Sequence, residues 1–215
     1  MKKELTEVVF ILDKSGSMAG LEKDTIGGFN STIQKQKEGK GEVIISTVLF
    51  DTYTKVIHDR VKIEEVKEMT KNDYYPSGCT ALLDAIGGAI KHIKNVHKYI
   101  REEDVPEKTL FIITTDGMEN SSHQYTYQKV KNMIEKMKNE YKWEFIFMGA
   151  NIDAIHTASR FGLDEEYAVN YIADEIGTKT NYDAINKAIY SVRECKELNA
   201  SWKEDIEEDY KKRNK

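Results

Sequence analysis

Carboxylates and hydroxyls gather in three short segments of the sequence, each beside an apolar run or an amphipathic stripe. The segments are 13–18 (DKSGSM), 74–80 (YYPSGCT) and 115–120 (TDGMEN). Two carboxylates that converge repel each other unless a proton or a cation lies between them. Hydroxyl and carboxylate oxygens favour Mg²⁺ or Mn²⁺ over zinc, and no Cys or His follows Asp13 or Asp116 in segments 13–18 and 115–120 to suggest a zinc site. If the segments meet in space, they predict a site for a hard divalent cation.

Each segment also has a simpler explanation. Asp, Ser and Gly after a strand form turns, and Thr80 by itself fits the N-cap of a helix. Asp13 favours a site, because it ends an apolar run, where a buried carboxylate without compensation is costly. Asp116 follows another apolar run in the same way.

The elements that must position these residues can be read from the apolar pattern. Four near-continuous apolar runs are typical of strands buried on both faces: 5–12, 43–50, 109–114 and 143–148. A fifth run, 55–58, follows the second after a link too short for anything but a hairpin, so we expect an antiparallel edge strand. A weaker strand is expected around 167–171. Amphipathic stripes predict helices at about 21–37, 81–100, 125–139 and 181–198, and a capping box at 201–204 predicts one more.

The alternation of strands and helices predicts an α/β fold with three layers, in which helices cover both faces of a mostly parallel sheet. In such a fold, ligands bind beyond the carboxyl ends of the strands, which is where segments 13–18 and 115–120 begin. We expect one domain over residues 1–198, followed by a helical extension and a charged tail over 199–215.

Composition excludes several classes of function. The chain has 215 residues and a formal net charge of −5, and its isoelectric point is near 5.7, which argues against a nucleic-acid partner. No apolar run approaches the roughly 20 residues of a membrane span. Cys79 and Cys195 form no CxxC unit, so we expect buried or half-buried thiols in a reducing compartment, the cytoplasm.

Three motifs together resemble the von Willebrand factor type A (vWA) domain with its metal-ion-dependent adhesion site (MIDAS). They are Asp13-x-Ser15-x-Ser17, Thr80 within SGCTALLDAIG, and Asp116 within TTDG. The motifs stand in the family's order, and the alternation of elements agrees through about residue 172. The segments 149–153 (GANID) and 173–178 (ADEIGT) are also similar to stand-alone bacterial and phage members. The resemblance implies a six-stranded sheet of order 3-2-1-4-5-6 with the third strand antiparallel.

The resemblance also implies a function. Asp13, Ser15, Ser17, Thr80 and Asp116 would bind Mg²⁺ or Mn²⁺, directly or through water, and leave one of six positions open. An Asp or Glu of a partner protein would fill that position, which makes the chain a metal-dependent protein-interaction module and not an enzyme, with no membrane or nucleic-acid partner.

Further residues on the same loops are expected to support the site or to form its partner-binding rim: Lys14, Met18, Tyr74, Tyr75, Asp84, Met118, Glu119 and Asn120. Tyr74 and Tyr75 are either interface anchors or, for one ring, packing beneath its own loop. Asp84 is either an acceptor for the serine hydroxyls or an exposed helix residue.

Two alternatives remain open. A Mg²⁺-dependent phosphatase of the haloacid-dehalogenase type also uses an aspartate after a strand, but it needs a second carboxylate two residues later, where this sequence has Ser15. The other alternative is a scaffold whose metal site is purely structural.

Overall fold

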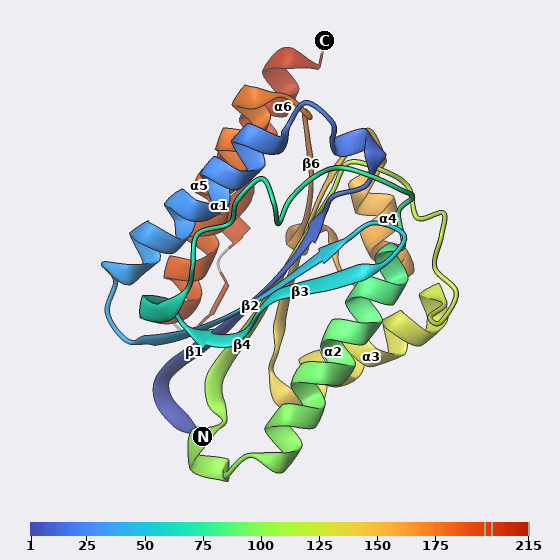
Figure 1. The fold of residues 1–215 in the computed structure, drawn as a ribbon. Coiled ribbons are helices and arrows are strands. Elements are labelled where there is room, and N and C mark those ends of the chain that lie inside the picture. The colour runs from blue at the N-terminus through green and yellow to red at the C-terminus, as the bar shows by residue number, and fades with distance from the viewer. Residues whose placement is uncertain (196, 199, 215) are drawn as a thin grey trace.

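The computed structural model describes residues 1–195, 197–198 and 200–214, with a six-stranded sheet of order β3-β2-β1-β4-β5-β6 (Figure 1). The strands are β1 (Lys2–Asp13), β2 (Glu42–Phe50), β3 (Thr54–Lys62), β4 (Pro106–Thr115), β5 (Glu144–Ala150) and β6 (Ala168–Tyr171). Only the β2–β3 pair is antiparallel among these neighbours. The predicted fold class, strand order and antiparallel edge strand are confirmed.

Helices cover both faces of this sheet (Figure 1). The helices are α1 (Glu22–Lys37), α2 (Leu82–Tyr99), α3 (Tyr127–Tyr141), α4 (Ala154–Arg160), α5 (Glu175–Tyr190) and α6 (Glu204–Arg213). Helices α1, α5 and α6 lie on one face, and α2, α3 and α4 lie on the other. Because successive side chains of a strand point to opposite faces, the central strand β1 supplies both cores.

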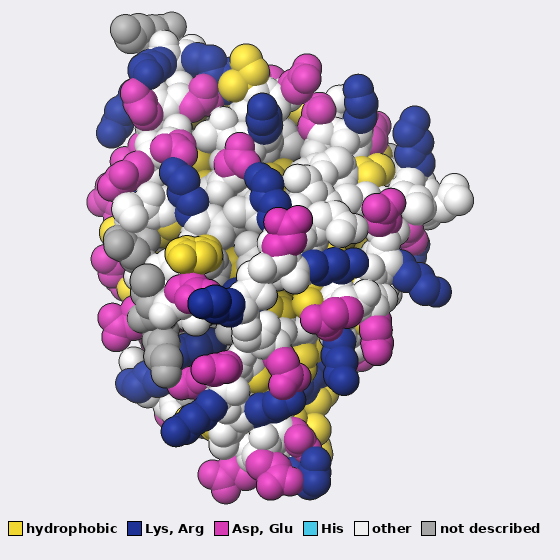
Figure 2. All heavy atoms as spheres, turned by 90° about the vertical axis from the view of Figure 1, so that its left-hand side faces the viewer, with side chains coloured by type: hydrophobic (Ala, Val, Ile, Leu, Met, Phe, Trp, Pro, Cys, Tyr) yellow, Lys and Arg dark blue, Asp and Glu magenta, His cyan; other side chains and the backbone are white. Residues whose placement is uncertain are grey.

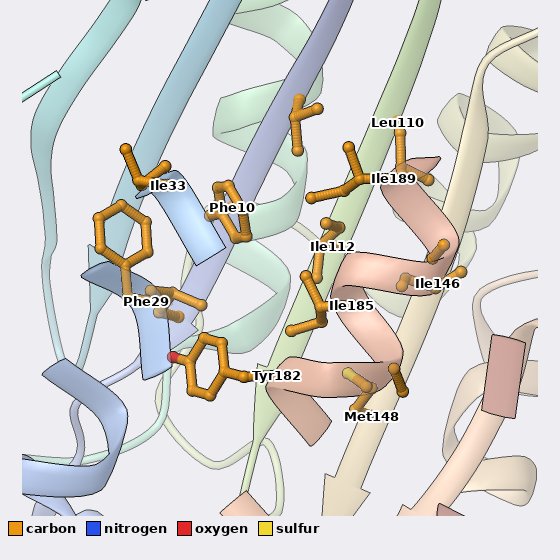
Figure 3. Close-up of a cluster of buried hydrophobic side chains, with 14 of the residues drawn as sticks. Phe10, Phe29, Ile33, Leu110, Ile112, Ile146, Met148, Tyr182, Ile185 and Ile189 are labelled. Carbon is orange, nitrogen blue, oxygen red and sulfur yellow. The ribbon is translucent and has the colours of Figure 1, made fainter. Parts of the chain in front are cut away.

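The core between the sheet and helices α1 and α5 is drawn in Figure 3. Phe10 of β1 meets Phe29 of α1 edge to face, with ring centroids 5.3 Å apart. On the same face, Ile185 and Ile189 of α5 point toward β4 and β5. This packing fixes β1, and therefore fixes the position at which Asp13 leaves the sheet.

Four local features differ from the sequence expectations. Helix α5 begins at Glu175, six residues before the predicted start, and the seven-residue helix α4 was not predicted. Helix α2 begins at Leu82 with Ala81 as its N-cap, so Thr80 lies just outside the helix and not at its cap. Cys79 is exposed, which corrects the expectation of a buried or half-buried thiol, because its loop lies on the surface. The side chain of Cys195 lies outside the described residues.

The segment 200–213 packs onto the sheet and not away from it. Trp202 and Ile206 are buried in the same core as β1 and α5, and the Trp202 indole N–H donates to the Glu166 carbonyl, 3.2 Å away. Basic and acidic side chains are interspersed over the face seen in Figure 2. In the described part of the chain, no helix is both long and apolar enough to cross a bilayer.

Candidate metal centre

The three polar segments meet at one edge of the sheet. Segments 13–18 and 115–120 lie at the ends of the parallel strands β1 and β4, and the Ser77 N–H of segment 74–80 donates to the Lys14 carbonyl at 2.8 Å. In the register, Asp13 stands beside Phe50 of β2, and Leu12 stands beside Thr114 of β4. Asp13 therefore leaves the sheet next to Thr115, one residue before Asp116. Strands β1 and β4 flank the point where the strand order reverses, which is where α/β sheets of this kind bind ligands.

A continuous set of hydrogen bonds links the two carboxylates. The Thr115 hydroxyl donates to Asp13 Oδ2 at 2.5 Å, and the Ser15 backbone N–H donates to Asp13 Oδ1 at 2.7 Å. The hydroxyls of Ser15 and Ser17 are 3.1 Å apart. Ser17 in turn donates to Asp116 Oδ1 at 2.5 Å, across 99 residues of sequence. The structure thus brings Asp13, Ser15, Ser17 and Asp116 into one cluster of oxygen atoms.

Both carboxylates are buried: Asp13 is 1% exposed and Asp116 is 2% exposed. Burial raises the pKa of Asp13 above its ordinary value, against the hydrogen bonds from Thr115 and Ser15, and repulsion from Asp116 raises it further. Burial also raises the pKa of Asp116, against the hydrogen bond from Ser17. The folded protein therefore disfavours two negative charges at this place when nothing balances them.

Thr80 joins the cluster from the loop that precedes α2. A Cβ placed on Gly117 would lie 3.3 Å from both Ser17 Oγ and Thr80 Oγ1, so these two hydroxyls lie close to the same glycine. Any side chain at this position would crowd the hydroxyls. Gly117 therefore keeps open the space into which the three segments point.

These residues fit a hard divalent cation. The five predicted ligands offer only hydroxyl and carboxylate oxygens, the donors that Mg²⁺ and Mn²⁺ accept. Among the described residues, no group of three or more His, Cys, Asp or Glu is arranged to hold a metal ion. A cation at this centre would therefore depend on serine and threonine hydroxyls beside two carboxylates, and its binding remains a prediction.

The residues predicted for the rim fall into two groups. Tyr75 and Met118 are 55% and 73% exposed, and Asn120 is also exposed. Tyr74 is buried beneath its own loop, where its hydroxyl donates to the Asp13 carbonyl at 2.6 Å. Met18 is buried as well. Tyr75 and not Tyr74 is therefore the aromatic side chain that faces solvent.

Lys14 points inward and forms an ion pair with Asp51, the residue that follows β2. Both side chains are buried, and the Lys14 ammonium also lies 5.0 Å from the ring centre of Tyr75. Burial raises the pKa of Asp51, but hydrogen bonds from Lys14, the Tyr53 backbone and Ser77 outweigh it, so the pKa lies below its ordinary value. Sequence reasoning missed Asp51, although its place directly after a strand is the signal that singled out Asp13.

The remaining two acids hold the loop that follows Asp116. Glu119 accepts hydrogen bonds from the backbone N–H groups of Leu83, Ser121 and Ser122 and from the Ser122 hydroxyl. Asp84 is half-buried, and its carboxylate accepts the backbone N–H groups of 123, 124 and 125. Asp84 is therefore neither an exposed helix residue nor an acceptor for the hydroxyls of Ser15 and Ser17, as the sequence led us to expect.

The sequence matches no known protein-family profile and no curated protein. The structure is similar to the vWF domain of the type V pili tip protein Mfa5 from Porphyromonas gingivalis, with a TM-score of 0.60 and 13% identity over 90% of this chain and 98% of that one. The fold is that of a vWA domain.

Two further structures with the vWA fold were solved with a metal. The manganese-loaded TRAP protein of Plasmodium vivax is 17% identical, with a TM-score of 0.55 over 83% of this chain and 73% of that one. Proximal thread matrix protein 1 of the mussel byssus, with a zinc-occupied MIDAS motif, is 11% identical, with a TM-score of 0.58 over 85% of this chain. This chain spans 47% of the mussel protein's length.

Proposed function

We propose that this chain is a metal-dependent protein-interaction module. In it, a divalent cation held by Asp13, Ser15, Ser17, Thr80 and Asp116 binds an Asp or Glu side chain of a partner protein. The observation that supports it best is the convergence of Ser17 and Asp116, whose side-chain oxygens are 2.5 Å apart at the ends of two neighbouring strands. Manganese in one vWA neighbour and zinc in another support a divalent cation in general. Mg²⁺ or Mn²⁺ is our choice for this chain, from its oxygen donors.

The charge balance favours an anionic partner. Two carboxylates offset the charge of a dication, and the three hydroxyls add none. Three hydroxyls and two carboxylates also leave at least one of six positions around Mg²⁺ for another ligand. Such a cation remains electrophilic, so a partner's carboxylate is the side chain that it would bind best.

The exposed rim would add apolar contact around that carboxylate. Tyr75 and Met118 are both largely exposed, on the two loops that flank the centre. Aromatic and methionine side chains are enriched in protein interfaces. We therefore expect the partner to present its acidic residue beside apolar side chains.

Selection of peptides tests the function directly. A random peptide library is displayed and bound to the immobilised chain in Mg²⁺, and the bound peptides are eluted with chelator. We expect enrichment of Asp or Glu, loss of binding when that acid is changed to Ala, and loss of binding by the variant Thr80→Val, which keeps the shape of the side chain but lacks the hydroxyl. Peptides that bind equally well in chelator, or that share no acidic residue, would contradict the proposal.

The absence of catalysis is part of the proposal, because the position two residues after Asp13 holds the hydroxyl of Ser15 and not a carboxylate. Hydrolysis of an aryl phosphate with Mg²⁺, abolished by Asp13→Asn, would favour the phosphatase alternative instead. A scaffold with a structural metal would be stabilised by the cation but would enrich no acidic peptide.

A further inference from the structure

The short segment 77–81, which presents Thr80, is held by atoms of other loops. It contains neither helix nor strand, so its backbone groups need partners elsewhere. The Ser77 N–H donates to the Lys14 carbonyl (2.8 Å), and the Cys79 N–H donates to Thr52 Oγ1 (2.9 Å). The Thr80 N–H donates to Asn120 Oδ1 (2.9 Å), and the Ala81 N–H donates to the Asp51 carbonyl (2.9 Å). Two of these four acceptors are side chains, those of Thr52 and Asn120.

Asn120 binds both the backbone N–H and the backbone carbonyl of Thr80. Its side-chain oxygen accepts the Thr80 N–H, and its own N–H donates to the Thr80 carbonyl at 3.0 Å. Asn120 lies four residues after Asp116, on the same loop. This reciprocal pair therefore sets the distance between one predicted ligand and the loop that carries another.

Thr52 binds the same segment from a different loop. It lies in the turn between β2 and β3, and its hydroxyl accepts the N–H of Cys79, the residue before Thr80. The neighbouring Gly78 has a positive φ of 69°, and a Cβ there would lie 2.7 Å from Thr52 Oγ1. The hydroxyl therefore packs closely against the backbone just before Thr80.

The two acceptors are themselves fixed in place. Glu119, next to Asn120, accepts the N–H of Leu83 in the first turn of α2. Asp51, next to Thr52, is bound by Lys14 and by the Tyr53 N–H, which is 2.8 Å from Asp51 Oδ1. The residues next to Asn120 and Thr52 thus tie both loops to their surroundings: Glu119 binds helix α2, and Asp51 binds Lys14.

We propose that Asn120 and Thr52 are positioning residues of the metal centre, which hold Thr80 where its hydroxyl can bind the cation. This rests on the proposed function. Both side-chain oxygens accept backbone N–H groups, so these residues would act through Thr80 and not as ligands. Without them, the N–H groups of Cys79 and Thr80 lose their partners and the segment can move, so cation binding would have to order it first.

The test measures Mg²⁺ and Mn²⁺ affinity by titration calorimetry and, separately, unfolding by urea in chelator. We expect Asn120→Ala and Thr52→Val each to weaken cation affinity roughly 10-fold, as is typical for residues that orient metal ligands. Asn120→Asp and Thr52→Ser keep the accepting oxygen and should bind the cation at least about as well as the parent. Asn72→Ala, an exposed residue of the same long loop, is the matched control and should not change the affinity.

The outcomes separate this inference from the proposed function. If Asn120→Ala and Thr52→Val lower only the stability in chelator and bind cation as the parent does, while Thr80→Val abolishes binding, the inference is wrong and the function stands. If Asn120→Asp binds as weakly as Asn120→Ala, the accepting oxygen is not what matters and the inference is also wrong. If the parent binds neither cation, both fail.

Discussion

Replacing Asp116 with asparagine separates two effects of the metal centre on stability: the destabilisation by its two buried carboxylates, and the stabilisation by a bound cation. The substitution removes one carboxylate but keeps an oxygen that can accept the Ser17 hydroxyl. Burial raises the pKa of Asp116, and burial with repulsion from Asp116 raises the pKa of Asp13. A carboxyl group with a raised pKa destabilises the folded state when it is ionised at neutral pH. In chelator at pH 7, we therefore expect Asp116→Asn to leave the free energy of unfolding unchanged or to increase it.

The cation should reverse this order of stability. A ligand that binds only the folded state contributes about 2.7 kcal/mol when its free concentration is 100 times the dissociation constant. In a domain of this size, each 1 kcal/mol shifts the melting temperature by about 2–4 °C, so the parent should melt roughly 5–11 °C higher. The variant lacks one ligand and one balancing charge, and it should not respond over the same range of Mg²⁺ concentration.

Differential scanning calorimetry with and without Mg²⁺ measures both effects. Glu68→Gln, which neutralises an exposed acid on the loop between β3 and α2, is the control and should respond to Mg²⁺ as the parent does. The reasoning is refuted if Asp116→Asn shows the parent's rise in melting temperature. It is also refuted if the variant is less stable than the parent in chelator by 2 kcal/mol or more, since Asp116 would then stabilise the fold without any cation.

Three further substitutions test the fold that carries the centre. Tyr74→Phe removes the hydroxyl that donates to the buried Asp13 carbonyl and should lower the free energy of unfolding in urea by about 1–3 kcal/mol. Trp202→Ala removes a side chain buried at the sheet and should cost about 3–5 kcal/mol in the same assay; an unchanged urea midpoint would show that segment 200–213 does not contribute to stability. Burial lowers the pKa of His58, so the unfolded chain takes up this proton first and stability falls as the pH drops below about 6.5. Urea unfolding between pH 7 and 5.5 should show a smaller loss for His58→Gln than for the parent, and equal losses would contradict this.

The sheet could be predicted from the sequence because its central strands are buried on both faces. Runs such as 5–12 and 43–50 are then apolar almost throughout, and the short link 51–54 allows only an antiparallel neighbour. The same reasoning located Asp13 and Asp116, since the residue after a parallel strand lies at the ligand-binding edge. Helix α4 escaped prediction because seven residues hold too few apolar positions to show a helical period.

What the sequence did not reveal are the directions of individual side chains. Lys14 follows a strand just as an exposed turn residue does, and its partner Asp51 lies 37 residues away. Glu7 looks like an ordinary polar residue within β1, yet it is fully buried. Its partners come from other elements: His97 of α2 at 2.5 Å and Arg60 of β3 at 3.2 Å. Such pairs depend on how helices dock on the sheet, and local patterns contain no information about that.

In the proposed function, the position left for the partner depends on residues that do not touch the cation. A free carboxylate close to the centre would compete with the partner's carboxylate for the open position, and Glu119 is only three residues from Asp116. The hydrogen bonds that Glu119 accepts from Leu83, Ser121 and Ser122 hold it against α2 instead. Asp51 is likewise occupied, because it forms an ion pair with Lys14. In the proposed function, the interactions that anchor the loops therefore also keep Glu119 and Asp51 from competing for the open position, which is left for a ligand from another molecule.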